Sequence, residues 1–117
     1  MALIRKLPAK AKEGARWKSQ RHLKHVRSHA CVNCDASAPI EAAHVRIGSD
    51  AGMGRKPSDY FAVPLCKDCH QLQHTVGERT FWEGKDVAEI IHQLVRTSPA
   101  FYEATDHRVE WERRNRG

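Results

Sequence analysis

Two pairs of cysteines with Cys-x-x-Cys spacing carry the most specific chemistry in this sequence. Cys31 and Cys34 form the first pair, and Cys66 and Cys69 form the second pair after thirty-one intervening residues. Thiolates spaced in this way can bind the same small tetrahedral ion, and two such pairs complete a four-thiolate zinc shell. The spacing therefore predicts one structural zinc ion that is held by all four cysteines.

Two disulfide bonds are the alternative interpretation of these cysteines, and they require an oxidising compartment. The N-terminus, Met1 to Lys6, is followed by no apolar stretch of signal-peptide length. No stretch of the sequence approaches the length of a transmembrane helix. We therefore expect a cytoplasmic protein without a membrane partner, in which paired cysteines act as metal ligands.

The composition indicates a small basic domain. The chain has 117 residues, of which 40% are hydrophobic, so we expect one thin core that zinc binding helps to fold. The net charge is +6, and nine Lys or Arg residues lie between Arg5 and Arg27 against a single acid, Glu13. Such basic stretches are typical of proteins that bind a phosphate backbone. A solvated basic tail that only maintains solubility is the alternative.

Three parts of the chain are predicted around the cysteines. Residues 1–17 are predicted to form a flexible basic arm. Residues 18–97 are predicted to form the zinc-bound domain with its flanking helices. Residues 98–117 are predicted to form a basic C-terminal helix or tail, because Ser98 and Pro99 are suited to the start of a helix.

Two flanking helices are predicted within the central part. Residues 19–27 form a short predicted helix with few apolar contacts. Residues 86–96 form the clearest predicted helix, because apolar residues recur there at the spacing of one helical face. The residues of that face are Val87, Ile90, Ile91, Leu94 and Val95.

The metal-binding module between these helices has a mixed pattern that predicts an α+β fold. Residues 41–47 and 61–65 are rich enough in β-branched or aromatic residues to be strands. A glycine-rich loop, residues 48–54, separates them, and residues 67–75 are compatible with a helix. The predicted order is strand, loop, strand and helix, with zinc joining the base of the hairpin to the start of the helix.

With this order of elements, the chain resembles the ββα-metal, or HNH, nucleases. It is similar in particular to a group of phage and prophage HNH proteins that includes RecA-dependent nucleases with a recombination enhancement function. The motifs that carry the resemblance are Cys31-Val32-Asn33-Cys34, Ala43-His44-Val45-Arg46, the run from Gly52 to Asp59, Pro64-Leu65-Cys66-Lys67-Asp68-Cys69-His70, His74, and the run from Gly77 to Trp82.

The resemblance implies roles for four side chains. His44 would be the general base that activates water, because imidazole titrates near neutral pH. Asp59 would orient this base or bind a cation, and His70 and His74, one helical turn apart, would hold a catalytic magnesium, manganese or second zinc ion. Taken without the resemblance, His44 is a hydrogen-bonded histidine at a strand end, His74 a surface residue, and Asp59 a turn cap.

Eight basic residues are predicted to contact DNA. They are Arg46, Arg55 and Lys56 near the base, and Arg16, Lys18, Arg21, Lys24 and Arg27 in the arm and first helix.

One position departs from the HNH pattern, in which a metal-binding Asp or His commonly precedes the general base. This chain has Ala43 at that position. With one protein ligand fewer, weak cation binding, low activity or dependence on a partner is expected.

The resemblance thus implies a metal-dependent endonuclease that hydrolyses DNA phosphodiester bonds and leaves 5′-phosphate and 3′-hydroxyl ends. It also implies a link to phage or prophage recombination, with DNA or a recombinase-coated DNA filament as partner. One such site cuts one strand at a time, so a monomer or a weak dimer is expected. A non-catalytic, zinc-stabilised DNA-binding accessory protein is the main alternative, and a zinc scaffold for protein contacts is disfavoured by the charge.

Overall fold

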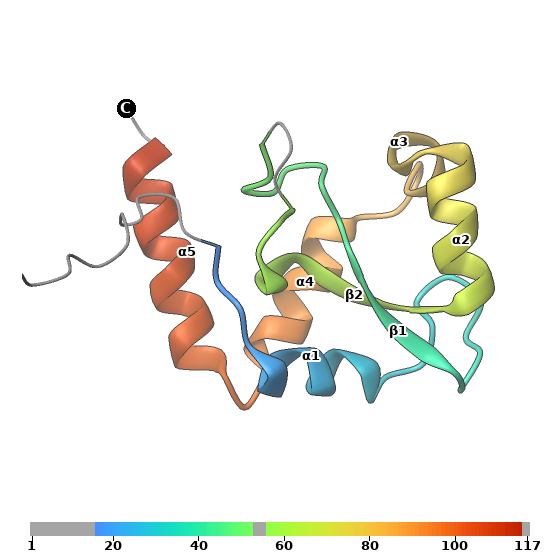
Figure 1. Cartoon of the computed structure of the whole chain (residues 1–117), viewed down its shortest axis with the longest axis horizontal. Coiled ribbons are helices and arrows are strands. Elements are labelled where there is room, and N and C mark those ends of the chain that lie inside the picture. The colour runs from blue at the N-terminus through green and yellow to red at the C-terminus, as the bar shows by residue number, and fades with distance from the viewer. Residues whose placement is uncertain (1–15, 53–55, 116–117) are drawn as a thin grey trace, which may run out of the picture.

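The computed structural model describes residues 16–52 and 56–115 (Figure 1). The predicted arm, residues 1–17, therefore lies outside the described residues except for its last two positions. The elements, in chain order, are α1 (Gln20–Arg27), β1 (Ile40–His44), the 3-10 turn η2 (Asp59–Phe61), β2 (Ala62–Cys66), α2 (Lys67–Val76), α3 (Glu78–Phe81), α4 (Val87–Arg96) and α5 (Phe101–Asn115). The mixed α+β class is confirmed.

An antiparallel hairpin of β1 and β2 crosses the middle of the molecule (Figure 1). Ile40 pairs with Cys66 at one end, and His44 pairs with Ala62 at the other end. α2 follows β2 directly, so the predicted order of strand, loop, strand and helix is present. α2 ends at Val76 and is followed by Gly77, whose φ of 90° is readily adopted only by glycine.

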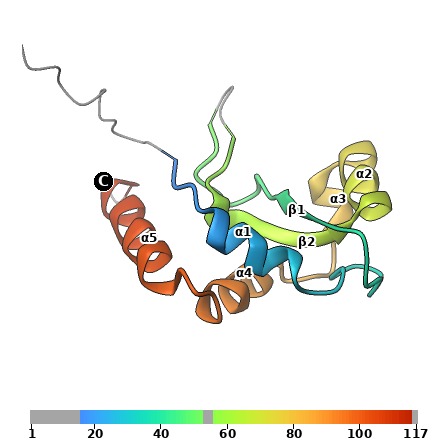
Figure 2. The same cartoon turned by 60° about the horizontal axis from the view of Figure 1, so that its bottom comes forward.

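Helices α1 and α4 lie side by side against the hairpin (Figure 2). Both were predicted from the sequence, and both begin with a side-chain cap. Ser19 accepts a hydrogen bond from the backbone N–H of His22, and Asp86 accepts one from that of Glu89. Such caps satisfy N–H groups that the first helical turn leaves without partners.

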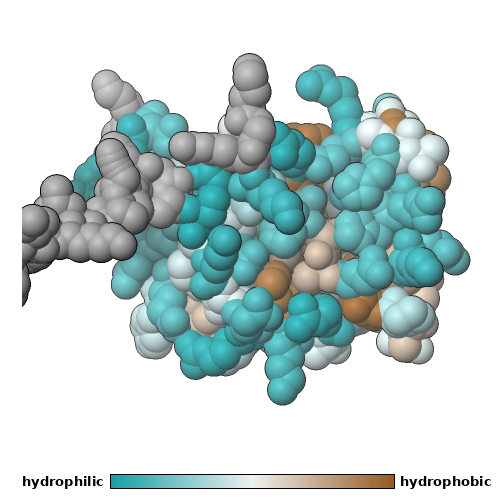
Figure 3. All heavy atoms as spheres, viewed as in Figure 1, coloured by the Kyte–Doolittle hydropathy of each residue, from teal (hydrophilic) through white to brown (hydrophobic). Residues whose placement is uncertain are grey.

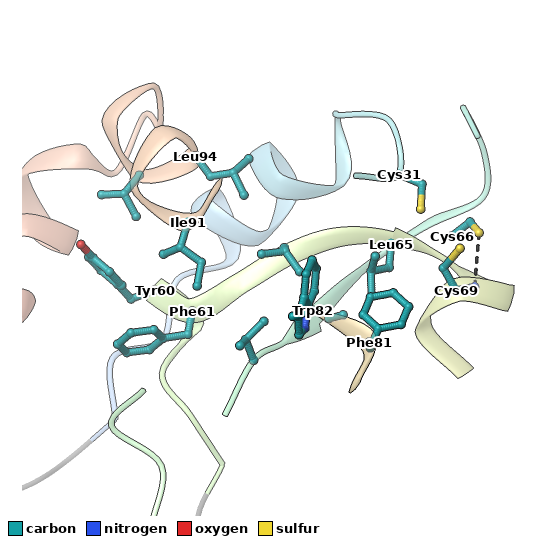
Figure 4. Close-up of a cluster of buried hydrophobic side chains, with 14 of the residues drawn as sticks. Cys31, Tyr60, Phe61, Leu65, Cys66, Cys69, Phe81, Trp82, Ile91 and Leu94 are labelled. Atoms are coloured by element: carbon teal, nitrogen blue, oxygen red, sulfur yellow. Dashed lines mark hydrogen bonds between the residues drawn. The ribbon is translucent and has the colours of Figure 1, made fainter. Parts of the chain in front are cut away.

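The hydrophobic core lies between the hairpin and these helices and continues to the cysteines (Figure 4). Leu65 of β2 is fully buried beside Phe81 and Trp82, which follow α2. Ile91 and Leu94 of α4 cover the part of the core near η2. This continuous packing makes the hairpin a rigid support for residues at both of its ends.

Some predicted boundaries were wrong, and hydrogen bonds explain one of the two clearest cases. β1 ends at His44 rather than at residue 47, because the carboxylate of Glu78 accepts the N–H groups of Arg46 and Ile47 at 2.9 Å. α5 begins at Phe101 rather than at residue 98, and it continues to Asn115. The short elements α3 and η2 were not predicted.

Two histidines without a predicted role are part of buried polar links. His22 contacts the Ser98 hydroxyl at 2.8 Å, and burial, together with nearby His25, lowers its pKa to about 4. His107 of α5 contacts Asp50, which also accepts hydrogen bonds from Ser58. Burial opposes ionisation of Asp50, but these hydrogen bonds lower its pKa to about 2.

Within residues 16–52 and 56–115, no helix combines the length and the apolar character that crossing a membrane requires.

Candidate functional site

The four cysteines converge at the end of the hairpin where Ile40 pairs with Cys66. Their sulfur atoms all lie within 4.8 Å of one another, which is compatible with a single tetrahedral zinc ion. Cys31 and Cys34 lie in the turn that precedes β1, Cys66 ends β2, and Cys69 lies in the first turn of α2. Figure 4 shows the sulfurs of Cys31, Cys66 and Cys69 directed toward one another beside Leu65.

Hydrogen bonds to sulfur give this cluster the character of a metal site. The N–H groups of Asn33 and Cys34 point at the sulfur of Cys31, and the side chain of Asn33 donates to that of Cys69 at 3.3 Å. Burial opposes ionisation of Cys31, but backbone N–H donors lower its pKa to about 6. The hydrogen bond from Asn33 stabilises the thiolate of Cys69. Burial and the neighbouring cysteines outweigh it and raise the pKa of Cys69 to about 12. A cation is what allows four thiolates to coexist at this separation.

His44 and Asp59 meet at the opposite end of the hairpin. His44 is the last residue of β1, and Asp59 begins η2, which directly precedes β2. The pairing of β1 with β2 therefore brings the two side chains together. Nε2 of His44 lies 2.8 Å from Oδ1 of Asp59, and the backbone N–H of Ser19 donates to Oδ2 at 2.8 Å. Burial opposes ionisation of Asp59, but the hydrogen bonds from His44 and Ser19 outweigh it and lower its pKa.

His70 and His74 lie on one face of α2, with ring centroids 5.1 Å apart. Nδ1 of His70 lies 2.7 Å from a carboxylate oxygen of Glu41, which projects from β1. A carboxylate only accepts hydrogen bonds, so this contact places the proton of a neutral His70 on Nδ1 and leaves Nε2 with its lone pair. Carboxylates commonly orient metal-binding histidines in this way.

One cleft of about 650 Å³, the histidine cleft, brings these groups together. It is lined by His44, Arg46, Ile47, Lys56, Pro57, His70, Gln73, His74, Gly77, Glu78 and Arg79. The face of the molecule that carries the hairpin and α2 in the view of Figure 1 is largely hydrophilic (Figure 3). The cleft therefore combines imidazoles with cationic side chains.

The histidine cleft contains fewer potential cation ligands than the resemblance to HNH enzymes led us to expect. In the part of the chain that the structure describes, the four cysteines are the only His, Cys, Asp or Glu group with three or more ligand atoms close together. Ala43 is fully buried and provides no ligand. Both carboxylate oxygens of Asp59 already accept hydrogen bonds, and His70 and His74 are the two imidazoles of the cleft that do not contact Asp59.

The predicted DNA contacts fall into separate groups. Arg46 and Lys56 line the histidine cleft, and Lys56 also lines a smaller cleft with Arg16 and Lys18. Arg21 instead forms a 2.5 Å ion pair with Glu103. Lys24 and Arg27 are exposed on α1 and line neither cleft. Arg55 lies outside the described residues.

Three charged side chains of this region were not assigned roles from the sequence: Glu41, Glu78 and Arg79. Glu78 and Arg79 belong to a motif of the resemblance, and that motif was the available indication of their position. Nothing in the local spacing connects Glu41 with His70, because the hairpin and the turn into α2 bring them together across twenty-nine positions.

Comparisons with known proteins give a family match. A family model described as "Protein of unknown function (DUF968)" matches residues 8–98. The chain is 34% identical over 61 residues to "Uncharacterized protein YdfU" of Escherichia coli K12. That alignment covers 51% of this chain and 17% of the relative, so the chain corresponds to a small part of that protein. No solved structure matches this chain.

Proposed function

The chain belongs to the DUF968 family, whose description assigns no function, and we propose that it is a metal-dependent HNH-type endonuclease that hydrolyses phosphodiester bonds in DNA. The observation that carries the proposal is the hydrogen-bonded pair of His44 and Asp59, which lies beside two further histidines in a cleft with cationic walls. A phage or prophage origin and a link to recombination are proposed with it, and they rest on the sequence resemblance alone.

The His44–Asp59 pair has the chemistry of an oriented general base. Asp59 is ionised at neutral pH because its pKa is lowered, so Nε2 of neutral His44 donates the hydrogen bond between them. Nδ1 of His44 then keeps the lone pair that accepts a proton from water. As the proton is transferred, the carboxylate of Asp59 stabilises the resulting imidazolium. The water oxygen attacks phosphorus, and the bond to the 3′ oxygen breaks.

His70 and His74 are the proposed ligands of the catalytic cation. Glu41 leaves Nε2 of His70 free for coordination, and His74 lines the same cleft one turn later. A cation bound there would supply charge neutralisation at the phosphoryl and leaving oxygens. Two imidazoles leave most coordination positions to water and phosphate oxygens, so we propose weak binding of the cation without DNA. Asp59 is assigned to orienting His44 and not to metal binding.

Replacement of Glu41 by glutamine is expected to weaken the response to the catalytic cation. The Mn²⁺ concentration that gives half-maximal cleavage should rise about 10- to 100-fold, which is the usual effect of losing a carboxylate behind a metal-binding histidine. The measurement is DNA nicking across a manganese titration. Glu83→Gln is the matched control, because Glu83 is exposed and lines neither cleft. Identical manganese curves for Glu41→Gln and native protein would contradict the role given to Glu41.

The nuclease proposal is tested by incubating the zinc-loaded protein with labelled single-stranded DNA and with supercoiled DNA. Cleavage is expected with magnesium or manganese and should yield 5′-phosphate ends. His92→Ala, which changes an exposed histidine of α4, should cleave like the native protein. Absence of cleavage in every cation, while DNA binding persists, would overturn the proposal.

A zinc-stabilised DNA-binding accessory protein is the second candidate function. Two observations favour it: Ala43 stands where a metal ligand is expected, and the described residues assemble no three-ligand site beyond the cysteines. The two candidates make opposite predictions for the nicking assay, which therefore decides between them.

A further inference from the structure

We propose that one DNA strand lies across two clefts that meet at His44, and that Lys18 and Arg79 contact its phosphates on opposite sides of the scissile bond. This inference rests on the proposed function for the position of the scissile phosphate. It adds a path for the substrate and assigns a role to Arg79, an exposed residue of α3.

Two clefts adjoin at the general base. The histidine cleft leads from His44 toward α3, where Arg79 forms part of its wall. The second cleft, here called the arm cleft, has a volume of about 400 Å³ and leads from His44 toward the N-terminal segment and the start of α1. It is lined by Arg16, Lys18, Gln20, Leu23, His44, Lys56, Pro57 and Asp59. His44, Lys56 and Pro57 belong to both clefts, so a single extended ligand can enter both.

Three cations along these clefts have side chains that are not neutralised by a carboxylate of residues 16–52 and 56–115. Among the residues that the structure describes, Lys18, Lys56 and Arg79 form no ion pair and no side-chain hydrogen bond. By contrast, glutamates neutralise several arginines elsewhere: Glu103 pairs with Arg21, Glu112 with Arg108, and Glu110 with Arg113. One such cation therefore lies in each cleft, Lys18 and Arg79, and a third, Lys56, lies at the junction.

The two acids that line the clefts, Glu78 and Asp59, form no ion pair with Lys18, Lys56 or Arg79. Glu78 accepts the backbone N–H groups of Arg46 and Ile47, and Asp59 accepts hydrogen bonds from His44 and Ser19. Their oxygens already face N–H donors of the protein. The groups left to face a ligand are cations and imidazoles, which favour a chain of phosphates.

A path with contacts on both sides of His44 has a consequence for substrate recognition. Each cleft should bind nucleotides on its own side of the scissile phosphate, so the two contributions to affinity are separate and additive. Lys56 at the junction should contribute to every substrate that includes the scissile phosphate. Lys18 and Arg79 should contribute only when nucleotides are present on the side that each contacts.

The test measures equilibrium binding of single-stranded oligonucleotides of about eight nucleotides, a length typical of such grooves. Binding is measured in the His44→Ala background without added magnesium or manganese, so that no cleavage is needed. Lys18→Gln and Arg79→Gln should each weaken binding of the full oligonucleotide about threefold to fivefold, as expected for one exposed charge contact. Each should also reduce the salt dependence, with a change in log–log slope of about 0.7.

Truncated oligonucleotides then locate each contact. Lys18→Gln should not change the affinity for an oligonucleotide that lacks the nucleotides on the Lys18 side of the scissile phosphate. Arg79→Gln should not change the affinity for an oligonucleotide that lacks the nucleotides on the Arg79 side. Lys24→Gln and Arg27→Gln are the matched controls, because both residues are exposed on α1 and line neither cleft. Their binding should equal that of the parent protein.

Two results would overturn the strand path. In the first, Lys18→Gln and Arg79→Gln each weaken the binding of both truncated oligonucleotides equally, which would indicate a diffuse charge effect. The other is equal competition by polyglutamate, which would indicate a general polyanion surface. A side-specific pattern without any nuclease activity would instead support the path and reject the proposed catalysis, so the two failures are distinguishable.

Discussion

His44→Ala is expected to reduce DNA cleavage by about 10²- to 10⁴-fold, the usual contribution of a general base. The substitution removes the proposed proton acceptor but leaves the cysteine cluster unchanged at the other end of the hairpin. The side chain of His44 is 29% exposed, so its loss creates no sealed core cavity. Zinc content should therefore equal that of the native protein, and unfolding should stay cooperative, with a midpoint lowered only by the loss of the hydrogen bond to Asp59.

The control for this prediction is His92→Ala, which makes the same chemical change at an exposed site on α4. All three proteins are compared by nicking rate after their zinc content has been shown to be equal. Equal rates for native protein and His44→Ala would mean that another group is the base. Loss of activity in both alanine variants would show that the assay reports a general defect.

The Asp59→Asn variant distinguishes an oriented pair from two independent residues. In native protein it should slow cleavage, because asparagine cannot stabilise the imidazolium as a carboxylate does. In the His44→Ala background it should have little further effect, since residues that act as a unit are strongly non-additive. Additive losses in the double variant would separate Asp59 from the action of His44.

Loss of zinc is expected to unfold the domain. Structural zinc in small domains contributes about 10–16 kcal/mol of apparent binding free energy, while a typical domain is stable by only about 5–15 kcal/mol. Cys66→Ser, or a chelator added to native protein, should abolish the cooperative thermal transition and reduce the helical circular dichroism signal. Restoring zinc to the chelated native protein should recover both.

Asn33→Ala is the matched control within the same cluster. Asn33 donates a hydrogen bond to the sulfur of Cys69 but is not itself a ligand. This variant should retain one zinc ion per chain, with a lower affinity than native protein. A zinc-free native protein that keeps its thermal transition and helical content would show that the core is sufficient without the metal.

Much of the fold was predictable because local patterns determined it. The apolar spacing from Val87 to Val95 predicted α4, and residues 19–27 were predicted to be a short helix with Leu23 and Val26 as its few apolar contacts. The two Cys-x-x-Cys pairs predicted the cluster at the hairpin base. In each case the residues that decide the structure are neighbours in sequence or share a chemistry with few alternatives.

The candidate site was less predictable because its supporting contacts are long-range. Glu41 reaches His70 through the pairing of β1 with β2, and Ser19 contacts Asp59 from forty positions away. The end of β1 depends on Glu78, which lies beyond α2. No local pattern encodes these contacts, since each depends on how separate elements pack together.

Residues 17–19 are connected to the end of the hairpin that carries His44 by three hydrogen bonds of their backbone. The N–H of Trp17 donates to the Ser58 hydroxyl, its carbonyl accepts from Asp59, and the N–H of Ser19 donates to the Asp59 carboxylate. Thermodynamic linkage makes this connection reciprocal. Whatever stabilises the docked segment also stabilises the ionised Asp59, and detaching the segment withdraws a donor from that carboxylate. The free energy that holds residues 17–19 against the hairpin is thus coupled to the ionisation of Asp59, the carboxylate that contacts His44.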